Sequence, residues 1–359
     1  MRIKYYFNFT EDGRSSMDQY CNRLINYQRK NFLSNKIDFF KPEISHFSKL
    51  IFSKTWGMRY SRYITYPKLV KRLEKHDVAH ICDHQYANLF SFLNSKLKFV
   101  TVHDLIPLIF NNKFGKSFLL KNSSLKNLKY FTKVFAISEN TKKDIIKLTD
   151  CPEEKIKVIM ETAEDYFNNN PINKNEICKK YNIPLNKKKI LISGNIFYKN
   201  NETAYKVLEN LNKVDKDIIF LHIGSGNNNK VKKENIFKIP FVEKKEIPDI
   251  YKICDLLFFP SIYEGFGMPI LEAMICGIPV VCSNNSSLPE VAGDAAMMSD
   301  CYDVNKFTKN ILEILSNNEL HFSMVNKSIK RSKKFTPEQF HKNILSIYEE
   351  EMNNEKKIS

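Results

Sequence analysis

The sequence predicts an α/β protein with two domains, each built on a parallel sheet. Short apolar runs repeatedly end at polar or glycine-containing loops, and a helix and a further apolar run then follow. Leu256–Phe259 shows this most clearly, because four apolar residues before Pro260 suit a strand buried on both faces. A chain of 359 residues is also long enough for two domains with full cores.

The first half of the chain begins with a strand, a loop and a helix. Arg2–Phe9 is the predicted strand, Thr10–Ser16 the loop, and Ser16 the residue that caps the helix. Leu69, Val70 and Leu73 mark a further helix whose other face carries basic residues. The remaining strands are expected at Ile37–Phe40, Val78–Ile81, Leu97–Val102, Lys133–Ile137 and Ile156–Ile159, with a helix at Asn140–Leu148 capped by Ser138.

The second half repeats the pattern after a polar linker broken by proline, Asn168–Asn175. We divide the chain into a first domain (1–168), a linker (169–185), a second domain (186–335) and a terminal helix with a frayed tail (336–359). Further strands are expected at Lys189–Gly194, Asp217–Gly224 and Phe237–Val242, a loop at Ser225–Asn229, and helices at Ile247–Cys254, Val304–Leu315 and Pro337–Glu351.

The most informative stretch follows the strand at Leu256–Phe259. Pro269 suits the first position of a helix, and Gly277 suits a left-handed residue at its end. Glu264 then lies in the loop at the carboxyl end of a strand, where open α/β sheets bind ligands. Glu272 lies one turn into the helix.

This loop has features that a diphosphate group requires. Gly265 and Gly267 carry no side chain that would block a ligand, and the first N–H groups of the helix are unpaired donors. A helix start of this kind binds anions. Glu264 and Glu272 fit such a site if they accept hydrogen bonds from sugar and ribose hydroxyls. The alternative is a glycine turn before a packed helix, with two incidental glutamates.

Glu264 and Glu272, with Gly-Phe-Gly-Met-Pro between them, resemble the paired glutamates of the retaining family 4 glycosyltransferases, also called glycosyl transferases group 1. The resemblance continues through Ser286–Ala296, although Ser287 and Glu290 also fit a helix-capping box. The family implies the GT-B fold: two Rossmann-like domains that face each other across a cleft, with the carboxyl-terminal helix crossing back to the first domain.

The resemblance also implies roles for individual residues. Glu264 would contact donor-sugar hydroxyls, Glu272 the ribose, and Lys199 the diphosphate. The sequence departs from the family at Asn195, where a second basic residue is often found, and the interval from Gly194 is one residue short. The full set of implied donor-binding residues is Gly194, Asn195, Asn200, Gly265, Phe266, Gly267, Met268, Leu271 and Glu272, with Glu264, Lys199 and His103 as catalytic residues.

A second motif, His103-Asp104-Leu-Ile-Pro, follows the strand that ends at Val102. It is similar to a family motif whose histidine lies near the reacting sugar. Asp104 either orients the imidazole or caps the next turn. In the family the first loop is richer in glycine and faces the acceptor and the donor phosphates, so the resemblance assigns Gly13, Arg14 and Asp104 to the acceptor side. This chain has only Gly13 in that loop, and a plain strand-to-helix turn is the alternative.

The charge is concentrated in the first half of the chain. Residues 1–180 hold 32 basic against 18 acidic residues, or +14, and residues 181–359 hold 24 against 22, or +2. A basic half suits an anionic membrane or a lipid-linked acceptor, and solvated surface lysines are the alternative. A nucleic-acid-binding protein is a further alternative, but the sequence has no motif for one, so we expect no nucleic acid partner.

The eight cysteines form no Cys-x-x-Cys pair, and we expect reduced thiols. The chain has no long apolar run and no signal-peptide pattern, so we expect a cytoplasmic protein, with peripheral membrane contact as an option. No Asp-x-Asp motif lies at a strand end, so neither a metal nor another cofactor is expected.

Taken together, these features predict a retaining, metal-independent hexosyltransferase that uses a nucleotide sugar and a glycan or lipid-linked acceptor in surface-polysaccharide synthesis. Mannose is the favoured sugar. A nucleotide-sugar epimerase on the same fold and a catalytically inactive glycan-binding subunit remain the alternatives.

Overall fold

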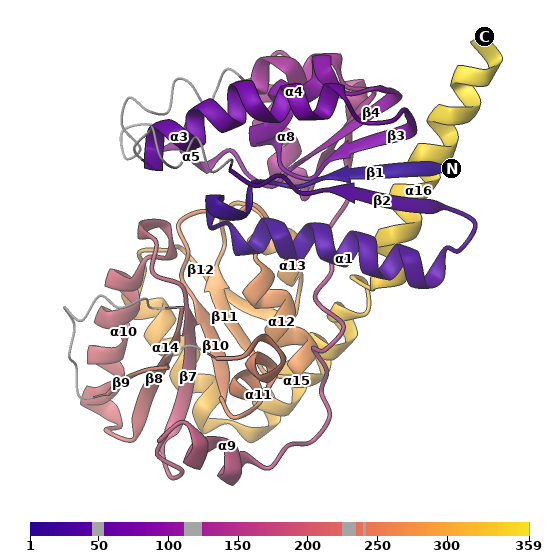
Figure 1. Cartoon of the computed structure of the whole chain (residues 1–359). Coiled ribbons are helices and arrows are strands. Elements are labelled where there is room, and N and C mark those ends of the chain that lie inside the picture. Colours follow the sequence, from indigo (N-terminus) through magenta and orange to yellow (C-terminus); the bar gives the residue numbers. More distant parts are fainter. Residues whose placement is uncertain (45–53, 111–123, 225–234, 240–241, 359) are drawn as a thin grey trace. The chain divides into compact units, whose positions relative to one another are not determined.

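In this computed structural model the described residues form two units (Figure 1). Residues 1–160 and 337–359 form the first unit, and residues 161–336 form the second. Each unit has six parallel strands among its described residues, with helices packed against the sheet. The structure describes all residues except 45–53, 111–123, 225–234, 240–241 and 359.

The sheet of the first unit has the strand order β2-β1-β3-β4-β5-β6. Its described elements are β1 (Arg2–Tyr6), η1 (Thr10–Asp12), α1 (Ser15–Asn31), β2 (Lys36–Phe40), α3 (Lys54–Tyr60), η2 (Ser61–Thr65), α4 (Tyr66–Lys71), β3 (His76–Ile81), η3 (His84–Phe92), β4 (Ser95–Val102), α5 (Ile106–Ile109), η4 (Leu125–Tyr130), β5 (Lys133–Ala136), α8 (Glu139–Leu148), η5 (Glu153–Lys155), β6 (Ile156–Val158) and α16 (Pro337–Ile358).

Apolar side chains cover both faces of this first sheet. On one face, α1 and α16 pack over Tyr5, and the Tyr348 ring of α16 lies 4.5 Å from the Phe99 ring, measured between centroids. On the other face, Tyr66 and Val70 of α4 are fully buried in a second cluster. Strands buried on both faces need nearly continuous apolar sequences, which is why these strands were recognisable.

The sheet of the second unit has the order β12-β11-β10-β7-β8-β9. Its described elements are α9 (Lys174–Lys180), β7 (Lys188–Ser193), η6 (Phe197–Lys199), α10 (Asn201–Val214), β8 (Ile218–Ile223), β9 (Ile236–Lys238), η7 (Lys244–Glu246), α11 (Ile247–Lys252), β10 (Leu256–Phe259), α12 (Met268–Cys276), β11 (Val280–Ser283), α13 (Leu288–Ala292), β12 (Ala296–Ser299), α14 (Val304–Ser316) and α15 (Asn318–Ser332).

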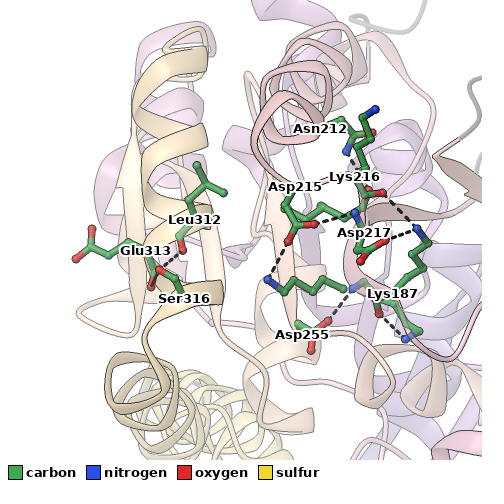
Figure 2. A network of polar contacts seen from close by, with 12 residues as sticks. Lys187, Asn212, Asp215, Lys216, Asp217, Asp255, Leu312, Glu313 and Ser316 are labelled. Atoms are coloured by element: carbon green, nitrogen blue, oxygen red, sulfur yellow. Dashed lines mark hydrogen bonds and ion pairs between the residues drawn. The ribbon is translucent and has the colours of Figure 1, made fainter.

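A polar network holds the amino-terminal ends of β7 and β8 together (Figure 2). Lys187 Nζ lies 2.6 Å from Asp217 Oδ1, and Lys188 Nζ lies 2.9 Å from Asp215 Oδ2. The backbone N–H of residue 189 donates to Asp255 Oδ2 at 2.6 Å, just before β10 begins. These carboxylates fix strand ends, and the candidate ligand-binding groups lie at the opposite edge of the sheet.

The helix ends test the sequence prediction in detail. Ser138 accepts a hydrogen bond from the Thr141 N–H and caps α8, as predicted. The predicted cap by Ser16 is wrong, because α1 already begins at Ser15 and no described side chain caps that end. The frayed tail is also wrong, since α16 continues to Ile358.

Two further predictions differ from the structure at segment boundaries. Residues 161–168, placed in the first domain from sequence, belong to the second unit, where Thr162 Oγ1 donates to the Phe335 carbonyl oxygen at 2.7 Å. The strand predicted at 237–242 is observed as β9, which ends before residues 240–241. The loop predicted at 225–229 lies outside the described residues.

Candidate functional site

The carboxyl edge of the second sheet brings together the residues predicted to bind an activated sugar. β7 leads to Gly194, and β10 leads to the loop that contains Glu264. Because β7 and β10 are paired parallel strands, both loops leave the same edge of the sheet. Lys199, in the short helix after Gly194, reaches Glu264 at this edge.

Lys199 and Glu264 form a mostly buried ion pair. Lys199 Nζ lies 2.7 Å from Glu264 Oε1, and the two side chains are 14% and 10% exposed. Ser261 Oγ donates to the same carboxylate oxygen at 2.6 Å. The Lys199 ammonium group also lies 4.6 Å from the centroid of the Phe259 ring. These contacts fix the cation and the carboxylate, because charge-assisted hydrogen bonds are stronger than neutral ones.

Gly194 makes room for the stem of Lys199. Its φ is +86°, and a Cβ atom there would lie 3.1 Å from Lys199 Cγ and Cε. The Gly194 carbonyl oxygen accepts hydrogen bonds from His222 Nε2 at 2.8 Å and Asn201 Nδ2 at 3.0 Å. A glycine is needed here both for its left-handed backbone and for the close approach of the lysine.

The two asparagines of this loop have different surroundings. Asn200 is buried, has a φ of +57°, and donates from its amide to the carbonyl oxygens of Pro260 at 3.0 Å and Cys301 at 2.7 Å. Asn200 thus ties together three loops of the unit. Asn195 is exposed, and its amide oxygen accepts from Asn201 Nδ2 at 3.4 Å. Contact of either residue with a donor stays a prediction.

Two serines hold the loop that carries Glu264. Ser286 Oγ accepts from the Glu264 N–H at 3.0 Å, and Ser287 Oγ lies 3.0 Å from the Glu264 carbonyl oxygen and 2.8 Å from that of Phe266. The predicted capping box of Ser287 and Glu290 is therefore wrong. The Ser287 hydroxyl is fully buried against the loop and makes no cap hydrogen bond to α13.

Helix α12 begins at the end of this loop. Gly267 has a φ of +105°, and a Cβ there would lie 2.8 Å from Leu288 Cδ2. Pro269 lies in the first turn, and Gly277 ends the helix with a φ of +71°, as predicted. The first N–H groups of a helix have no partner within it, and together with the helix dipole they attract anions.

Glu272 lies one turn into α12 and is half-buried. The hydroxyl of Tyr251, a fully buried residue of α11, donates to Glu272 Oε2 at 2.6 Å. This bond fixes one oxygen of the carboxylate. The Leu271 side chain is fully buried, and the Phe266 ring packs edge-on against Phe335 with 5.8 Å between centroids. Any donor contact of Leu271 or Phe266 therefore involves the backbone more readily than the side chain.

The carboxyl edge of the first sheet places the second group of predicted residues. The His103 ring is buried, and its Nε2 lies 2.8 Å from the Cys82 carbonyl oxygen. Asp104 Oδ1 accepts from the Ile106 N–H at 3.0 Å, so Asp104 caps the turn into α5, one of its two predicted roles. Burial raises the pKa of the Asp104 carboxyl. Gly13 adopts a φ of +66°, with no atom within 4 Å of a Cβ placed there.

Asp83 is a candidate site residue that the sequence did not single out. It is 1% exposed, and its Oδ2 lies 2.8 Å from Asn8 Nδ2 and 3.1 Å from Arg14 Nη1. Its Oδ1 accepts from the Gln85 N–H at 2.9 Å. The available signal was its place just after β3. Its partners Asn8 and Arg14 are 75 and 69 residues away in the chain, so no local spacing revealed them.

The pKa of Asp83 follows from these contacts. Burial alone would raise it, but the nearby Arg14 and the side chains of His84 and His103 hold the pKa of the carboxyl well below its usual range. Burial in turn lowers the pKa of His84 to about 4. The first unit therefore keeps an ionised carboxylate next to the neutral His84 imidazole, with the half-buried Arg14 guanidinium 32% exposed at its border.

The expectation of eight reduced cysteines is wrong for one pair. Cys21 of α1 and Cys82, directly after β3, form a disulfide with their Cα atoms 6.1 Å apart. The two residues are 61 positions apart in sequence, so their spacing gave no signal. The other six cysteines are free and buried. Among them, burial raises the pKa of the Cys151 thiol to about 11, which makes this thiol unreactive at neutral pH.

Two parallel α/β units, one of which carries a glycine-containing loop and a helix start at its carboxyl edge, define the GT-B class of fold. Residues 173–331 match the family model described as Glycosyl transferases group 1. This match lies in the second unit and contains the glutamate motif that resembles the family in the sequence.

Two relatives and one solved structure illustrate the match. O-antigen chain mannosyltransferase B of Escherichia coli is 39% identical over 108 residues, which cover 30% of this chain and 28% of that protein. The serotype-specific mannosyltransferase WbdA of Escherichia coli is 25% identical over 254 residues, covering 65% of this chain and 31% of that protein. The matches thus span about a third of the length of these relatives.

The solved structure of Alr3699/HepE from Anabaena, in complex with UDP-glucose, supports the fold. It matches with a TM-score of 0.75 at 14% identity, covering 98% of this chain and all of that one (100%). Identity this low supports the fold and not the substrate.

Proposed function

We propose that this protein is a retaining, metal-independent glycosyltransferase that moves a hexose from a nucleotide-diphosphate sugar to a glycan or lipid-linked acceptor in surface-polysaccharide synthesis. The observation that carries the proposal is the Lys199–Glu264 pair, 2.7 Å apart beside the start of α12. A fixed cation and a helix start suit a diphosphate, and fixed carboxylates suit hydroxyl groups.

The donor would occupy the carboxyl edge of the second sheet. The N–H groups at the start of α12 and the Lys199 ammonium group would meet the diphosphate. Glu264 would accept hydrogen bonds from sugar hydroxyls, and Glu272, held by Tyr251, would accept them from the ribose. In this arrangement Lys199 would give up part of its contact with Glu264 and bind the phosphate instead. The ion pair in the free protein therefore positions both side chains before the donor binds.

The reaction would break the bond between the anomeric carbon and the diphosphate oxygen. The acceptor oxygen would form its new bond on the same face of that carbon, and the acceptor proton would pass to the leaving diphosphate. Negative charge grows on the leaving group in the transition state. Lys199 and the α12 N–H groups are the residues of this chain that would stabilise that charge without a metal ion.

The acceptor would bind at the carboxyl edge of the first sheet. His103, Arg14 and Asp83 lie there, with Arg14 held by Asp83 at 3.1 Å. The part-exposed Arg14 guanidinium offers donors to sugar hydroxyls or to a phosphate group, and the His103 imidazole lies beside it at the same edge.

Mannose is the proposed sugar, because both relatives described above are named mannosyltransferases. The names of these relatives indicate the sugar but not the nucleotide base, so we propose to test GDP-mannose first and UDP-glucose second. We also propose a cytoplasmic protein that contacts the membrane from its inner face, where lipid-linked acceptors are found.

Incubation with radiolabelled nucleotide sugars, with and without a lipid or glycan acceptor pool, tests the proposal. We expect release of nucleoside diphosphate and label in the acceptor, both insensitive to chelation of divalent metals. Conversion of the donor to another nucleotide sugar in the absence of acceptor would instead identify an epimerase. Binding of the donor without hydrolysis or transfer would identify an inactive subunit.

A further inference from the structure

One helical run of the first unit has an exposed face that the proposed chemistry does not use. α3, η2 and α4 follow one another without a break, and the residues at both junctions, Tyr60 and Tyr66, have α-helical backbone angles. Figure 1 shows α3 and α4 as a single long run at one side of the first unit. One side of this run packs into the core, where Tyr66 and Val70 are fully buried.

The opposite side exposes large apolar residues at helical spacing. Trp56 is 62% exposed, Tyr60 41% and Ile64 40%. Intervals of four residues place these three side chains in one row, and Lys68 continues the same row as an exposed residue. An amphipathic run would normally show charged residues here, so a row of tryptophan, tyrosine and isoleucine indicates a binding face.

Basic residues accompany this row. The Arg59 guanidinium lies 5.5 Å from the Trp56 ring centroid, and Lys71 and Arg72 are exposed at the carboxyl end of the run. The sequence from 56 to 73 contains five basic residues and no acidic residue. One of the five, Arg62, is buried against the Tyr86 ring and serves the fold, not the surface.

From this arrangement we propose that the α3–α4 run docks the protein on an anionic lipid bilayer. We define the docking face as Trp56, Arg59, Tyr60, Ile64, Lys68, Lys71 and Arg72. Tryptophan and tyrosine favour the membrane interface, and basic side chains beside them attract anionic headgroups. Among the described residues, no helix is long and apolar enough to cross a bilayer, so contact through this face would be interfacial.

The charge pattern argues against a second copy of the chain as the occupant. A second copy of the chain on a two-fold axis would bring this basic face against itself, and like charges at an interface are unfavourable. The proposal deepens the membrane contact within the proposed function and names the surface that makes it. It rests on that function only for its biological purpose, because lipid binding can be measured without donor or acceptor.

The chain supplies its own probe, since Trp56 is its only tryptophan. We expect the fluorescence of the full chain to shift to shorter wavelength with vesicles of phosphatidylglycerol and phosphatidylcholine in equal parts, and brominated lipid to quench it. Vesicles of phosphatidylcholine alone should cause little shift, and added salt should weaken binding. An absent shift with anionic vesicles, or equal shifts with both vesicles, would overturn the proposal.

Charge-reversal substitutions test whether the docking face is the surface that binds lipid. Lys68→Glu with Lys71→Glu should lower sedimentation with anionic vesicles by at least about tenfold. The matched control is Lys327→Glu with Lys330→Glu, two exposed lysines of α15 in the second unit, and it should bind like the wild type. Equal losses in both variants would show nonspecific attraction and contradict the proposal, and so would a Trp56 shift that follows protein concentration without lipid. Donor hydrolysis, measured in parallel, should be unchanged in both variants, so failed lipid binding with intact hydrolysis refutes only the docking face.

Discussion

The two sheets share one architecture but carry different chemistry at their carboxyl edges. In the second unit, the edge carries the Lys199 ammonium group, the start of α12 and the carboxylates of Glu264 and Glu272. The glycines in the loops around them add no side chains of their own. In the first unit, the edge is lined by a buried ionised carboxylate, Asp83, and by the imidazoles of His84 and His103. Parallel α/β folding thus supplies the edge, and a few residues after each strand decide what the edge can bind.

This difference predicts that a substitution in the second unit causes the largest loss of catalysis. Lys199→Ala should lower kcat about 100- to 1,000-fold, because a preorganised donor of positive charge to the leaving diphosphate is lost. Lys206→Ala is the matched control, since Lys206 is an exposed lysine of α10 paired with Glu202. Steady-state kinetics with the donor found in the activity assay would check this. A kcat equal to that of the control would remove Lys199 from the mechanism.

Glu272 should affect donor binding more than the chemical step. Glu272→Ala should raise the donor KM roughly 10- to 100-fold, since a hydrogen bond to a charged group contributes about 1.5 to 3 kcal/mol. Tyr251→Phe keeps the carboxylate but removes the hydroxyl that orients it at 2.6 Å, and should raise KM only a few-fold. If Tyr251→Phe matches Glu272→Ala while the fold is intact, or if neither changes KM, Glu272 does not bind the donor as proposed.

A substitution at Asp83 should affect acceptor binding but not donor hydrolysis, and so distinguish the roles of the two sheet edges. Asp83→Asn releases the Arg14 guanidinium and should raise the acceptor KM about tenfold, with donor hydrolysis nearly unchanged. Asp150→Asn, at an exposed position of the first unit, serves as the control. Since the substitution also weakens a buried pair, the melting temperature should be recorded with the kinetics. An equal loss of donor hydrolysis would contradict the division of roles.

The buried histidines predict a smaller, pH-dependent difference. Burial lowers the pKa of His80 to about 3 and that of His84 to about 4, so both stay neutral in the folded first unit. The unfolded chain binds these protons near pH 6.5, and folding stability therefore falls as the pH drops from about 6.5 towards 4. Thermal unfolding followed by Trp56 fluorescence, which reports on the first unit, measures this loss.

The same experiment has an internal comparison. His84→Gln should flatten the dependence of the melting temperature on pH, whereas His321→Gln in the second unit should leave the Trp56 transition unchanged. A melting temperature that stays constant between pH 7 and pH 4.5 would contradict neutral, buried imidazoles.

The features that could be predicted from sequence are local ones. Pro269 and Gly277 mark α12 because each has a backbone preference that acts within a single turn. Ser138 caps α8 for the same reason. The glutamate motif was readable because Glu264, the glycines and Glu272 lie in one short stretch of the chain.

The features that sequence did not reveal depend on distant partners. Ser287 follows a capping pattern, but its hydroxyl contacts loop carbonyl oxygens 23 and 21 residues away. Asp83 and the Cys21–Cys82 pair join segments more than 60 positions apart, and no spacing rule covers them. The docking face was also only partly foreseen: the sequence indicated a basic helix near Leu69, whereas the exposed aromatic residues begin at Trp56.

Equilibrium titration of nucleoside diphosphates tests the central claim most directly. The wild-type protein should bind GDP or UDP in isothermal titration calorimetry with one site per chain. The double variant Lys199→Ala, Glu272→Ala should bind at least about 100-fold more weakly while it keeps the wild-type melting temperature. Affinity that is equal in the wild type and the double variant would show that the nucleotide does not bind at the carboxyl edge of the second sheet, and the account would be wrong.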